Sequence, residues 1–558
     1  MTRYLDTGTP GDAELLFLPL GGAGEIGMNL NLYGHAGAWL MVDLGITFGD
    51  ASTPGIDVIM PDPSFIEERR DQLVGLVLTH AHEDHIGAVA YLWDRLRCPV
   101  YATPFTAAVL RRKLAEAGLL ERVPLTEIPL SGRFTVGPFA IELITLTHSI
   151  PEPNALVIET PVGRVMHTGD WKLDPDPLVG PTADEKALIR VGESGVLAMV
   201  CDSTNVLVSG DSGSEADVRD TLLDIVGRYE NRVAVACFAS NVARLETLAR
   251  VGAAHGRDVA LVGRSLWRIY EAAKETGYLR DIPPFLGERD VGYMPRDKVL
   301  MICTGSQGEP RSALARIAAG DHPEVSLESG DTVIFSSRII PGNEISINRM
   351  HNRLSELGVQ VVTTNEEHVH VSGHPARDEL AQMYQWIRPR IAVPVHGEPR
   401  HLVAHAKLAL ECQVPEAVVV QNGAMVCLAP GRAEIIDEVF TGRLAVDGRH
   451  LVDLESSAIR DRRRMIYHGS AVATVILGRD GELHGLPIVS LHGIEPGERE
   501  DAILPPVVEA VADAVNALSD RDRNDDEQVS EAARRAVRRA LRQISGKRPH
   551  TEVHLVRV

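Results

Sequence analysis

The chain has 558 residues, more than one ordinary hydrophobic core accommodates, so about two to four domains are expected. Its 44% hydrophobic residues indicate a folded chain, and its net charge of −21 argues against binding a polyanion through general surface charge. A polyanion would need a locally positive channel, which bound metal ions can supply. Six scattered cysteines without a Cys-x-x-Cys pair indicate reduced thiols.

No membrane or export segment is evident in the sequence. No apolar run approaches the ~20 residues that cross a bilayer. The first residues lack the basic and apolar regions of a secretory signal. The sequence therefore predicts a cytoplasmic protein with no membrane partner.

Near the N-terminus, residues 14–20 are predicted to form a strand that leads into a glycine-rich turn. Residues 22–27 match Gly-x-Gly-x-x-Gly, but a dinucleotide site needs a helix to begin there. Residues 28–33 alternate instead, which predicts a second strand and a hairpin. The next apolar strand ends in Asp43, whose carboxylate either orients a ligand histidine or caps its own turn.

The motif His-x-His-x-Asp-His occupies residues 80–85, directly after the apolar strand 73–79. His80 and His82 are two residues apart, so an extended backbone places them on one side. The aspartate and the last histidine follow the turn. One loop can thus offer two nitrogen ligands to one metal and a nitrogen–oxygen pair to a second metal about 4 Å away. The alternative is a histidine-rich surface turn.

After this motif, helices are predicted at 86–96 and 106–117, with a strand at 99–102, which indicates a layered α/β fold. Two later strands end in His148 and Asp170. Either residue alone is more often structural, but the order of a cluster, a histidine and an aspartate, each ending a strand, predicts metal ligands. Asp170 is the expected bridge, since a carboxylate can contact two ions.

These residues stand in the order of the metallo-β-lactamase superfamily motifs, which the chain therefore resembles. Downstream segments narrow the resemblance to the β-CASP group of nucleic-acid hydrolases and, within it, to the bacterial ribonuclease J family. These segments are 197–205, 238–241, 304–310, 340–344, 370–374 and 394–398. The resemblance covers roughly residues 10–450. It implies an α/β protein with a four-layer αββα metallo-β-lactamase domain, an inserted α/β β-CASP domain and a small C-terminal α/β domain.

The motif positions predict five segments. They are 10–208 (metallo-β-lactamase domain, first part), 209–371 (β-CASP insertion), 372–449 (metallo-β-lactamase domain, second part), 450–465 (charged linker) and 466–558 (C-terminal domain). The C-terminal domain is predicted from strands 472–477, 487–490 and 553–558, helices 506–518 and 531–544, and an acidic connector, 520–527. The arginines of its second helix are either a solvated face or a surface for RNA or a partner subunit. The resemblance implies that such domains support dimerisation.

The resemblance also assigns metal ligands. One metal would be held by His80, His82, His148 and Asp170. The other would be held by Asp84, His85, Asp170 and His396. Asp202, His374 and His396 match the three β-CASP motifs, and no motif position is substituted. The nitrogen and oxygen ligands suit Zn²⁺, with Mn²⁺ as the alternative.

The expected chemistry is hydrolysis of a phosphodiester, leaving a 5′-phosphate. Two divalent ions lower the pKa of water and clamp the attacking and leaving oxygens. Asp84 or Asp170 would orient the attacking hydroxide. His374, oriented by Asp202, would protonate the leaving 3′-oxygen or stabilise the charged phosphorane.

Substrate contacts are predicted in two places. Backbone amides around Ser372 and Gly373 would bind phosphate, together with the neighbouring His370, Val371 and His374. Candidates for gripping a terminal 5′-phosphate are Ser240, Asn241, Arg264 and Ser265, with ordinary strand-end turns as the alternative. Asp50 and Asp447 are candidates for a structural cation such as Ca²⁺. His167 and His401 receive no role.

Three functions compete. The leading prediction is a 5′→3′ exonuclease on 5′-monophosphorylated single-stranded RNA, with endonuclease activity, in RNA maturation and decay. It is expected to form a homodimer, or alternatively a tetramer, and to join an RNA-degradation complex. The second is a DNA-processing β-CASP nuclease, against which His396 and the segment 304–310 argue. The third is an RNA-binding scaffold with structural metals.

Overall fold

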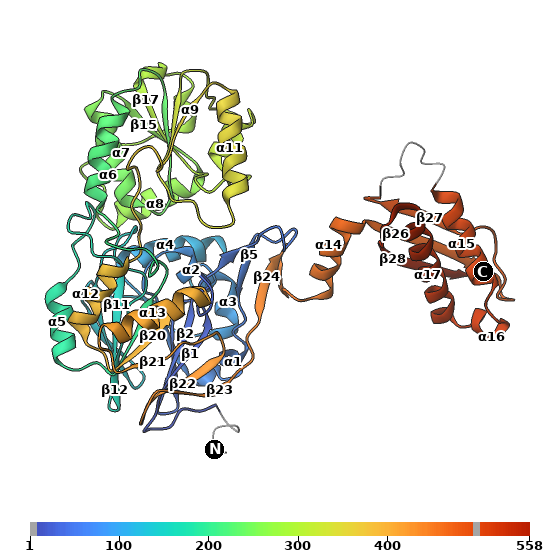
Figure 1. Ribbon diagram of the computed structural model, residues 1–558, viewed down its shortest axis with the longest axis horizontal. Coiled ribbons are helices and arrows are strands. Elements are labelled where there is room, and N and C mark those ends of the chain that lie inside the picture. The colour runs from blue at the N-terminus through green and yellow to red at the C-terminus, as the bar shows by residue number, and fades with distance from the viewer. Residues whose placement is uncertain (1–7, 495–502) are drawn as a thin grey trace. The chain divides into compact units, whose positions relative to one another are not determined.

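The computed structural model describes residues 8–494 and 503–558, which divide into two compact units (Figure 1). The first unit comprises the residues up to Thr47 and Met60–Thr441, and the second comprises Phe48–Ile59 and Gly442–Val558. Each unit has a hydrophobic core of its own. No helix within the described ranges is long and apolar enough to cross a membrane.

Two β-sheets pack face to face in the first unit. The eight-stranded sheet has the order β23 (Glu434–Glu438), β22 (Ala424–Ala429), β1 (Leu15–Gly21), β2 (Leu30–His35), β3 (Ala38–Val42), β6 (Leu73–Val77), β7 (Val100–Ala102), β8 (Leu125–Glu127). The seven-stranded sheet has the order β21 (Glu416–Ala417), β20 (Ile391–Val395), β13 (Ala198–Asp202), β12 (Gly163–His167), β11 (Asn154–Thr160), β10 (Phe139–Thr145), β9 (Arg133–Val136). Their inner faces share one core, in which Leu40 and Val77 of one sheet join Leu156 and Val200 of the other.

Helices cover the outer faces of both sheets. They are α1 (Ser64–Glu67), α3 (Val89–Leu96) and α4 (Pro104–Glu116) on the eight-stranded sheet, and α5 (Glu185–Glu193), α12 (Arg377–Ile387) and α13 (Pro399–Glu411) on the other (Figure 1). Leu188 and Met383 pack against Met166 and Met199 of the strands, because each helix turns its apolar stripe to the sheet. This is the predicted αββα order.

Two local predictions near the N-terminus have different outcomes. β1 and β2 pair antiparallel, which confirms the glycine-rich hairpin over a dinucleotide-binding turn. The single helix predicted at 86–96 is wrong in detail, because α2 (Glu83–Ile86) ends just before Gly87 and α3 begins at Val89. Glycine has a low helix propensity, which is consistent with a break in the helix there.

Six strands end at the same edge of the sandwich. β3 runs parallel to β6, and β12, β13 and β20 run parallel to one another. β10 runs in the same direction as β12 because both pair antiparallel with β11. These six strands lead into Asp43, His80, His148, Asp170, Asp202 and His396. Topology therefore gathers residues that are far apart in the sequence.

The inserted domain is a six-stranded parallel sheet between β13 and α12. Its strands have the order β16 (Leu286–Gly287), β15 (Asp258–Val262), β17 (Val299–Cys303), β14 (Val233–Ala236), β18 (Thr332–Phe335), β19 (Gln360–Val362). Its helices are α6 (Glu215–Val226), α7 (Val242–Ala254), α8 (Arg264–Glu275), α9 (Glu288–Val291), α10 (Ala313–Ala318) and α11 (Glu344–Glu356). Every residue of β14, β17 and β18 is buried, as expected where helices cover both faces of a parallel sheet.

The second unit contains a three-stranded sheet, β27 (Ile488–His492), β26 (Ser470–Leu477) and β28 (His550–Arg557). β26 and β27 correspond to two predicted strands and pair antiparallel, and α15 (Leu504–Asn516) and α17 (Asp526–Ser545) supply most of the core. The predicted linker 450–465 forms β25 (His450–Asp453) and much of α14 (Ser457–His468), which buries Ile459. The predicted connector contains a further short helix, α16 (Asp520–Arg523), capped by Ser519. A four-stranded sheet has the order β25, β24 (Arg443–Asp447), β5 (Val58–Pro61), β4 (Thr47–Phe48).

Candidate metal centre

The histidine-rich loop follows β6 and is held from behind by Asp43. The Asp43 carboxylate accepts hydrogen bonds from the backbone N–H and the hydroxyl of Thr79, each 2.8 Å long, and lies 2.7 Å from Nδ1 of His85. Asp43 has a φ of 62°, a left-handed conformation that is uncommon outside glycine and turns the chain directly after β3. Of the two roles considered for Asp43, the contact with a motif histidine is the one the structure shows.

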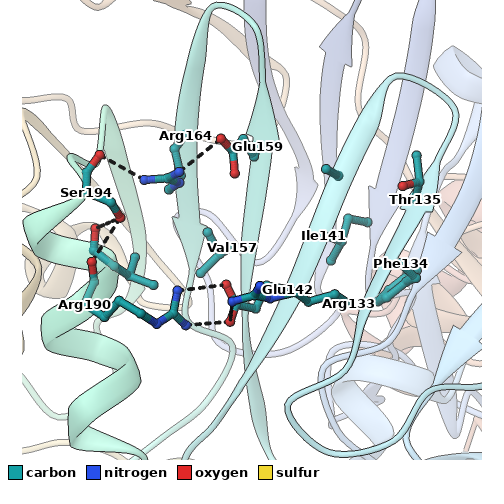
Figure 2. Close-up of a pocket in the computed structure, with 12 residues that line it drawn as sticks. Arg133, Phe134, Thr135, Ile141, Glu142, Val157, Glu159, Arg164, Arg190 and Ser194 are labelled. Carbon is teal, nitrogen blue, oxygen red and sulfur yellow. Dashed lines mark hydrogen bonds and ion pairs between the residues drawn. The ribbon is translucent and has the colours of Figure 1, made fainter.

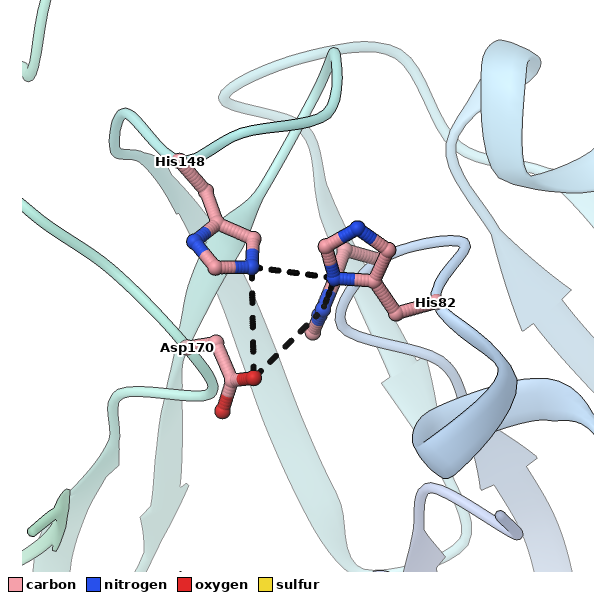
Figure 3. A group of neighbouring side chains, drawn as sticks. His82, His148 and Asp170 are labelled. Atoms are coloured by element: carbon pink, nitrogen blue, oxygen red, sulfur yellow. Dashed lines mark hydrogen bonds and ion pairs between the residues drawn. The ribbon is translucent and has the colours of Figure 1, made fainter. Parts of the chain in front are cut away.

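The first ligand group comprises His80, His82, His148 and Asp170 (Figure 3). Nδ1 of His82 lies 3.1 Å from Nε2 of His80 and 3.0 Å from Nε2 of His148. Oδ2 of Asp170 lies 3.8 Å and 3.9 Å from those two Nε2 atoms. Ligand atoms at the corners of a tetrahedral zinc site are about 3.3 Å apart for bonds of about 2.0–2.1 Å. The spacing therefore fits one four-coordinate ion.

The second group comprises Asp84, His85, Asp170 and His396. Nε2 of His85 lies 3.1 Å from Oδ2 of Asp170, and Nε2 of His396 lies 3.2 Å from Oδ2 of Asp84. Nδ1 of His396 lies 2.8 Å from Oδ1 of Asp170. Asp170 belongs to both groups, which is the arrangement expected of a bridging ligand.

Several atoms of this cluster are buried without a hydrogen bond. Oδ1 of Asp170 and both ring nitrogens of His396 make none of acceptable geometry, although they lie close to one another. Buried polar atoms are nearly always paired, so close but misdirected atoms indicate groups that converge on something else. A divalent cation satisfies nitrogen and oxygen lone pairs in this way. The residues present therefore fit metal ions in both groups.

The histidines of the first group are held neutral. Burial, reinforced by the neighbouring histidines, holds the pKa of His80 and of His148 well below the usual value. Burial also lowers the pKa of His82 to about 4. A neutral imidazole is the form that binds a metal, so this group is ready to bind at neutral pH.

Carboxylates reverse this effect in the second group. Burial opposes the charged form of His85 and of His396, but the attraction of Asp170 and neighbouring carboxylates outweighs it and raises the pKa of both. The same attraction, against burial, holds the pKa of Asp84 and of Asp170 below the ordinary value. The negative charges of Asp84 and Asp170 are thus balanced by His85 and His396. A bound cation would balance the same charges in their place.

His374 lies beside the two groups. Its Nδ1 is 2.8 Å from Oδ2 of Asp202 and 3.8 Å from Oδ2 of Asp170. Asp202 is fixed in turn because its Oδ1 accepts from the N–H and the hydroxyl of Thr204. Burial opposes the charged form of His374, but Asp202 and Asp170 outweigh burial and raise its pKa. With its side chain 23% exposed, His374 combines a raised pKa with access to a substrate.

The segment 372–374, predicted from the sequence to bind phosphate, also positions a ligand histidine. The Gly373 carbonyl contacts Nδ1 of His148, and a Cβ on Gly373 would lie 2.6 Å from that imidazole ring. Only glycine leaves room for the ring there. Ser372 accepts from the His374 N–H and, together with the His374 carbonyl, contacts the side-chain amide of Asn205. Phosphate binding by these amides stays a prediction.

The four residues predicted to bind a 5′-phosphate differ in how close they lie to the metal cluster. Ser240 Oγ lies 3.1 Å from Nε2 of His82, at the metal cluster. Asn241 is used inside the protein, because its side chain caps α7 and donates to Glu215. Arg264 and Ser265 are exposed in the first turn of α8. Of the four, Ser240 has the clearest place in the site.

The remaining predicted residues have ordinary partners. Asp447 pairs with Arg462 at 2.6 Å, and Asp50 accepts from Ser52. Neither aspartate belongs to a group of three or more potential ligands in the part of the chain that the structure describes, so the calcium site stays a prediction.

The unassigned histidines have hydrogen-bond partners, whereas Nδ1 of His370 has none. His167 lies 2.9 Å from the Tyr33 hydroxyl, and His401 accepts from the Glu398 N–H at the start of α13. Nδ1 of His370 is buried without a hydrogen bond, and burial lowers its pKa to about 3.

Sequence reasoning missed two orienting residues. Asn29, between β1 and β2, places its side-chain amide 3.1 Å from Nε2 of His85. Asn205 holds the segment 372–374, as described above. Both are buried amides near motif residues. Asn205 lies in the segment 197–205 that carries the family resemblance, whereas Asn29 offered only a polar residue in an alternating pattern, which occurs too often to identify it.

A separate pocket of about 460 Å³ lies against the seven-stranded sheet and α5 (Figure 2). Its charged side chains already pair with one another, since Glu142 contacts Arg133 and Arg190, and Glu159 contacts Arg164. No predicted site residue lines it. The pocket therefore takes no part in the metal centre.

Four family models match successive parts of the chain. They are "Metallo-beta-lactamase superfamily" (residues 5–225), "Ribonuclease J, beta-CASP domain" (230–354), "Zn-dependent metallo-hydrolase RNA specificity domain" (358–415) and "Ribonuclease J C-terminal domain" (457–558). The αββα sandwich, its metal centre and the parallel insertion thus define a metal-dependent hydrolase of the metallo-β-lactamase superfamily with a β-CASP domain.

Curated relatives narrow this class. The chain is 46% identical to ribonuclease J of Sinorhizobium meliloti over 98% of each chain, and 40% identical to ribonuclease J of Mycolicibacterium smegmatis over 93% of each chain. A solved structure titled as a protein of unknown function from Enterococcus faecalis shares the fold alone, with a TM-score of 0.51 and 16% identity over 74% of this chain and 100% of that one. The chain belongs to the ribonuclease J family, and it is a hydrolytic ribonuclease that binds RNA and divalent metal.

Proposed function

We propose that this ribonuclease degrades 5′-monophosphorylated single-stranded RNA from the 5′ end and also cuts internally, using two divalent ions, Zn²⁺ or alternatively Mn²⁺. The observation that carries the proposal is the pair of ligand groups sharing Asp170, with His374 beside them. The direction and the preference for a 5′-monophosphate rest on the resemblance to the ribonuclease J family. A cytoplasmic homodimer, or a tetramer, within a degradation complex belongs to the same proposal.

The geometry supports a proposed role for each of these residues. Two bound divalent ions supply Lewis acidity, which lowers the pKa of water and neutralises charge at a phosphate. The first group would hold one ion with three neutral imidazoles, and Asp170 belongs to both groups. Asp84, whose side chain is 29% exposed, is the carboxylate best placed to accept a proton from an attacking water.

His374 is the proposed proton donor. Its Nδ1 faces Asp202, which stabilises the protonated ring and leaves Nε2 to point elsewhere. A raised pKa keeps a proton available near neutral pH, which suits donation to a leaving 3′-oxygen. In this proposal the three first-group histidines, whose pKa values are lowered, would serve as ligands, and the ring paired with Asp202 would serve as the acid.

Substrate contacts remain part of the proposal. Amides at Ser372 and Gly373, with His370, Val371 and His374 next to them, would receive a phosphate close to the metal groups. Arg264 and Ser265 are exposed and able to meet the 5′-phosphate. Asn241 would act indirectly, by fixing the turn that carries Ser240.

The test uses the purified full chain with end-labelled single-stranded RNA carrying a 5′-monophosphate or a 5′-triphosphate, with Zn²⁺ or Mn²⁺. We expect processive loss of the monophosphorylated strand with release of mononucleotides, and cleavage slowed by about 10²- to 10⁴-fold in His374→Ala. His484→Ala, a change of an exposed histidine in the second unit, is the matched control.

Each alternative has its own outcome. Internal cuts alone would remove the 5′-end proposal and leave an endonuclease. Cleavage of DNA but not RNA would favour the DNA-processing alternative, and metal binding without any cleavage would favour the RNA-binding scaffold.

A further inference from the structure

Each first-group histidine has a second ring nitrogen that faces away from the ligand cluster. Nδ1 of His80 lies 3.0 Å from the Thr79 hydroxyl, and Nδ1 of His148 contacts the Gly373 carbonyl. Both partners belong to the metallo-β-lactamase domain. His82 differs, because its Nδ1 faces the cluster and its Nε2 lies 3.1 Å from Oγ of Ser240, in the inserted domain.

The contact indicates which nitrogen of the His82 ring carries the hydrogen. A neutral imidazole carries one N–H, and the nitrogen that binds a metal must be the one without it. Since Nδ1 of His82 meets Nε2 of His80 and of His148, the hydrogen belongs on Nε2, where Ser240 Oγ accepts it. Outer partners of this kind set the tautomer and orientation of a ligand histidine.

Ser240 is itself held by a buried network. It lies between β14 and α7, in a turn closed by a 3.1 Å bond from the Asn241 N–H to the Phe238 carbonyl. The Asn241 side chain accepts from the Arg244 N–H and donates to Glu215, and Glu215 pairs with Arg244 at 2.8 Å. Ser240 therefore has a position set by the interior of the inserted domain.

We propose that Ser240 is a positioning residue for the metal centre: it fixes the tautomer and ring orientation of His82, so that the inserted domain completes the first ligand group. The proposal rests on the metal-binding role assigned above to that group. It also differs from the sequence-based expectation, in which Ser240 gripped a terminal phosphate. The two roles separate experimentally, because one acts on metal affinity and the other on substrate affinity.

The experiment measures Zn²⁺ and Mn²⁺ affinity directly, by titrating metal-free full-length protein against a chromophoric chelator. Ser240→Ala should weaken binding of one of the ions by about 10- to 100-fold, the usual effect of losing an outer partner. Ser240→Thr keeps a hydroxyl and should restore most of the affinity. Ser355→Ala, an exposed serine on α11, is the matched control and should bind like the parent chain.

A double-substitution cycle tests whether Ser240 acts through His82. In a His82→Ala background, Ser240→Ala should add no further loss of affinity. The Co²⁺ absorption spectrum of Ser240→Ala should shift, because the geometry of one ligand changes. Thermal unfolding of the metal-free proteins shows whether each variant folds.

Two results would overturn the proposal. One is parental metal affinity in Ser240→Ala with a raised KM for 5′-phosphorylated RNA, which would make Ser240 a substrate contact. The other is an equal loss of affinity with and without His82. A parent chain that binds both ions but cleaves no RNA would instead defeat the proposed function, and the affinity comparison would still stand.

Discussion

Two buried charged clusters of the first unit differ in how their charges are balanced. In the inserted domain, Glu215 and Arg244 are almost fully buried and pair directly at 2.8 Å, and the guanidinium also donates to the Val369 carbonyl. In the metal centre, Asp170 and His396 are equally buried, yet Asp170 Oδ1 and both His396 nitrogens lack a hydrogen bond. In the first cluster the opposite charges meet directly, although Arg244 Nε also lacks a hydrogen bond. In the second, several ligand atoms converge without pairing, which indicates a ligand that the protein does not itself supply.

The outer contacts strengthen this comparison. In the metal centre, three ligand histidines are contacted at the ring nitrogen that faces away from the cluster. Asp43 contacts His85, Gly373 contacts His148 and Ser240 contacts His82. The ligand atoms on the inner side of these rings face one another within the two groups. Substitutions in the metal centre should therefore reduce function more than stability, and substitutions in the Glu215–Arg244 cluster should reduce stability.

The largest expected effect is on catalysis. His374→Ala should lower kcat by about 10²- to 10⁴-fold, the usual contribution of general acid catalysis, with unchanged metal content. His374 belongs to neither of the two proposed metal groups, so it should be lost without loss of ions. Steady-state kinetics and metal analysis of the same preparation check this. A parallel fall in metal content would show that His374 is a ligand.

The next effect is on stability. Arg244→Met leaves Glu215 buried without its partner and should lower the free energy of unfolding by about 3–5 kcal/mol. Urea unfolding of the metal-free protein measures it. Arg112→Ala, which breaks an exposed pair with Glu275, is the control and should cost no more than about 1 kcal/mol. Equal losses in the two variants would contradict the contrast between buried and exposed pairs.

A smaller effect is expected behind the ligands. Asp43→Asn keeps the shape of the side chain but weakens its hold on His85, so metal affinity should fall by about 10- to 100-fold. Chelator competition measures the affinity, and stability without metal should change less than in Arg244→Met. An unchanged metal affinity would indicate that Asp43 only caps its own turn.

The smallest effect appears on acidification. Burial opposes ionisation of Glu215, but Arg244 outweighs burial and holds its pKa below the ordinary value of 4.5. A lowered pKa in the folded state adds stability above the unfolded value, and that stability is lost as pH falls through the folded pKa. Urea unfolding at pH 7, 5 and 4 should therefore show a steeper acid loss in the parent chain than in Arg244→Met. Parallel curves would show that the pair does not titrate as stated.

Much of the fold could be predicted from local sequence patterns. Apolar runs gave the strands, helical stripes gave α15 and α17, and alternation at residues 28–33 correctly replaced a nucleotide-binding turn with a hairpin. The structure adds elements that were not predicted where the pattern is polar. The segment 450–465 was predicted as a linker because it is rich in arginine, yet arginine is a good helix former and α14 needs little more than the buried Ile459 to anchor it.

The sequence by itself determined the chemistry of the site, because histidine and aspartate ligands in the motif 80–85 and at strand ends carry their identity in their side chains. Only the tertiary structure decided their arrangement. The parallel course of six strands brings the ligand groups to one edge, and Ser240 and Asn205 reach them from points more than a hundred residues away from His82 and His374. Hydrogen bonds between such distant residues leave no periodic trace in the chain, so the roles of Ser240, Asn205 and Gly373 became visible only in the fold.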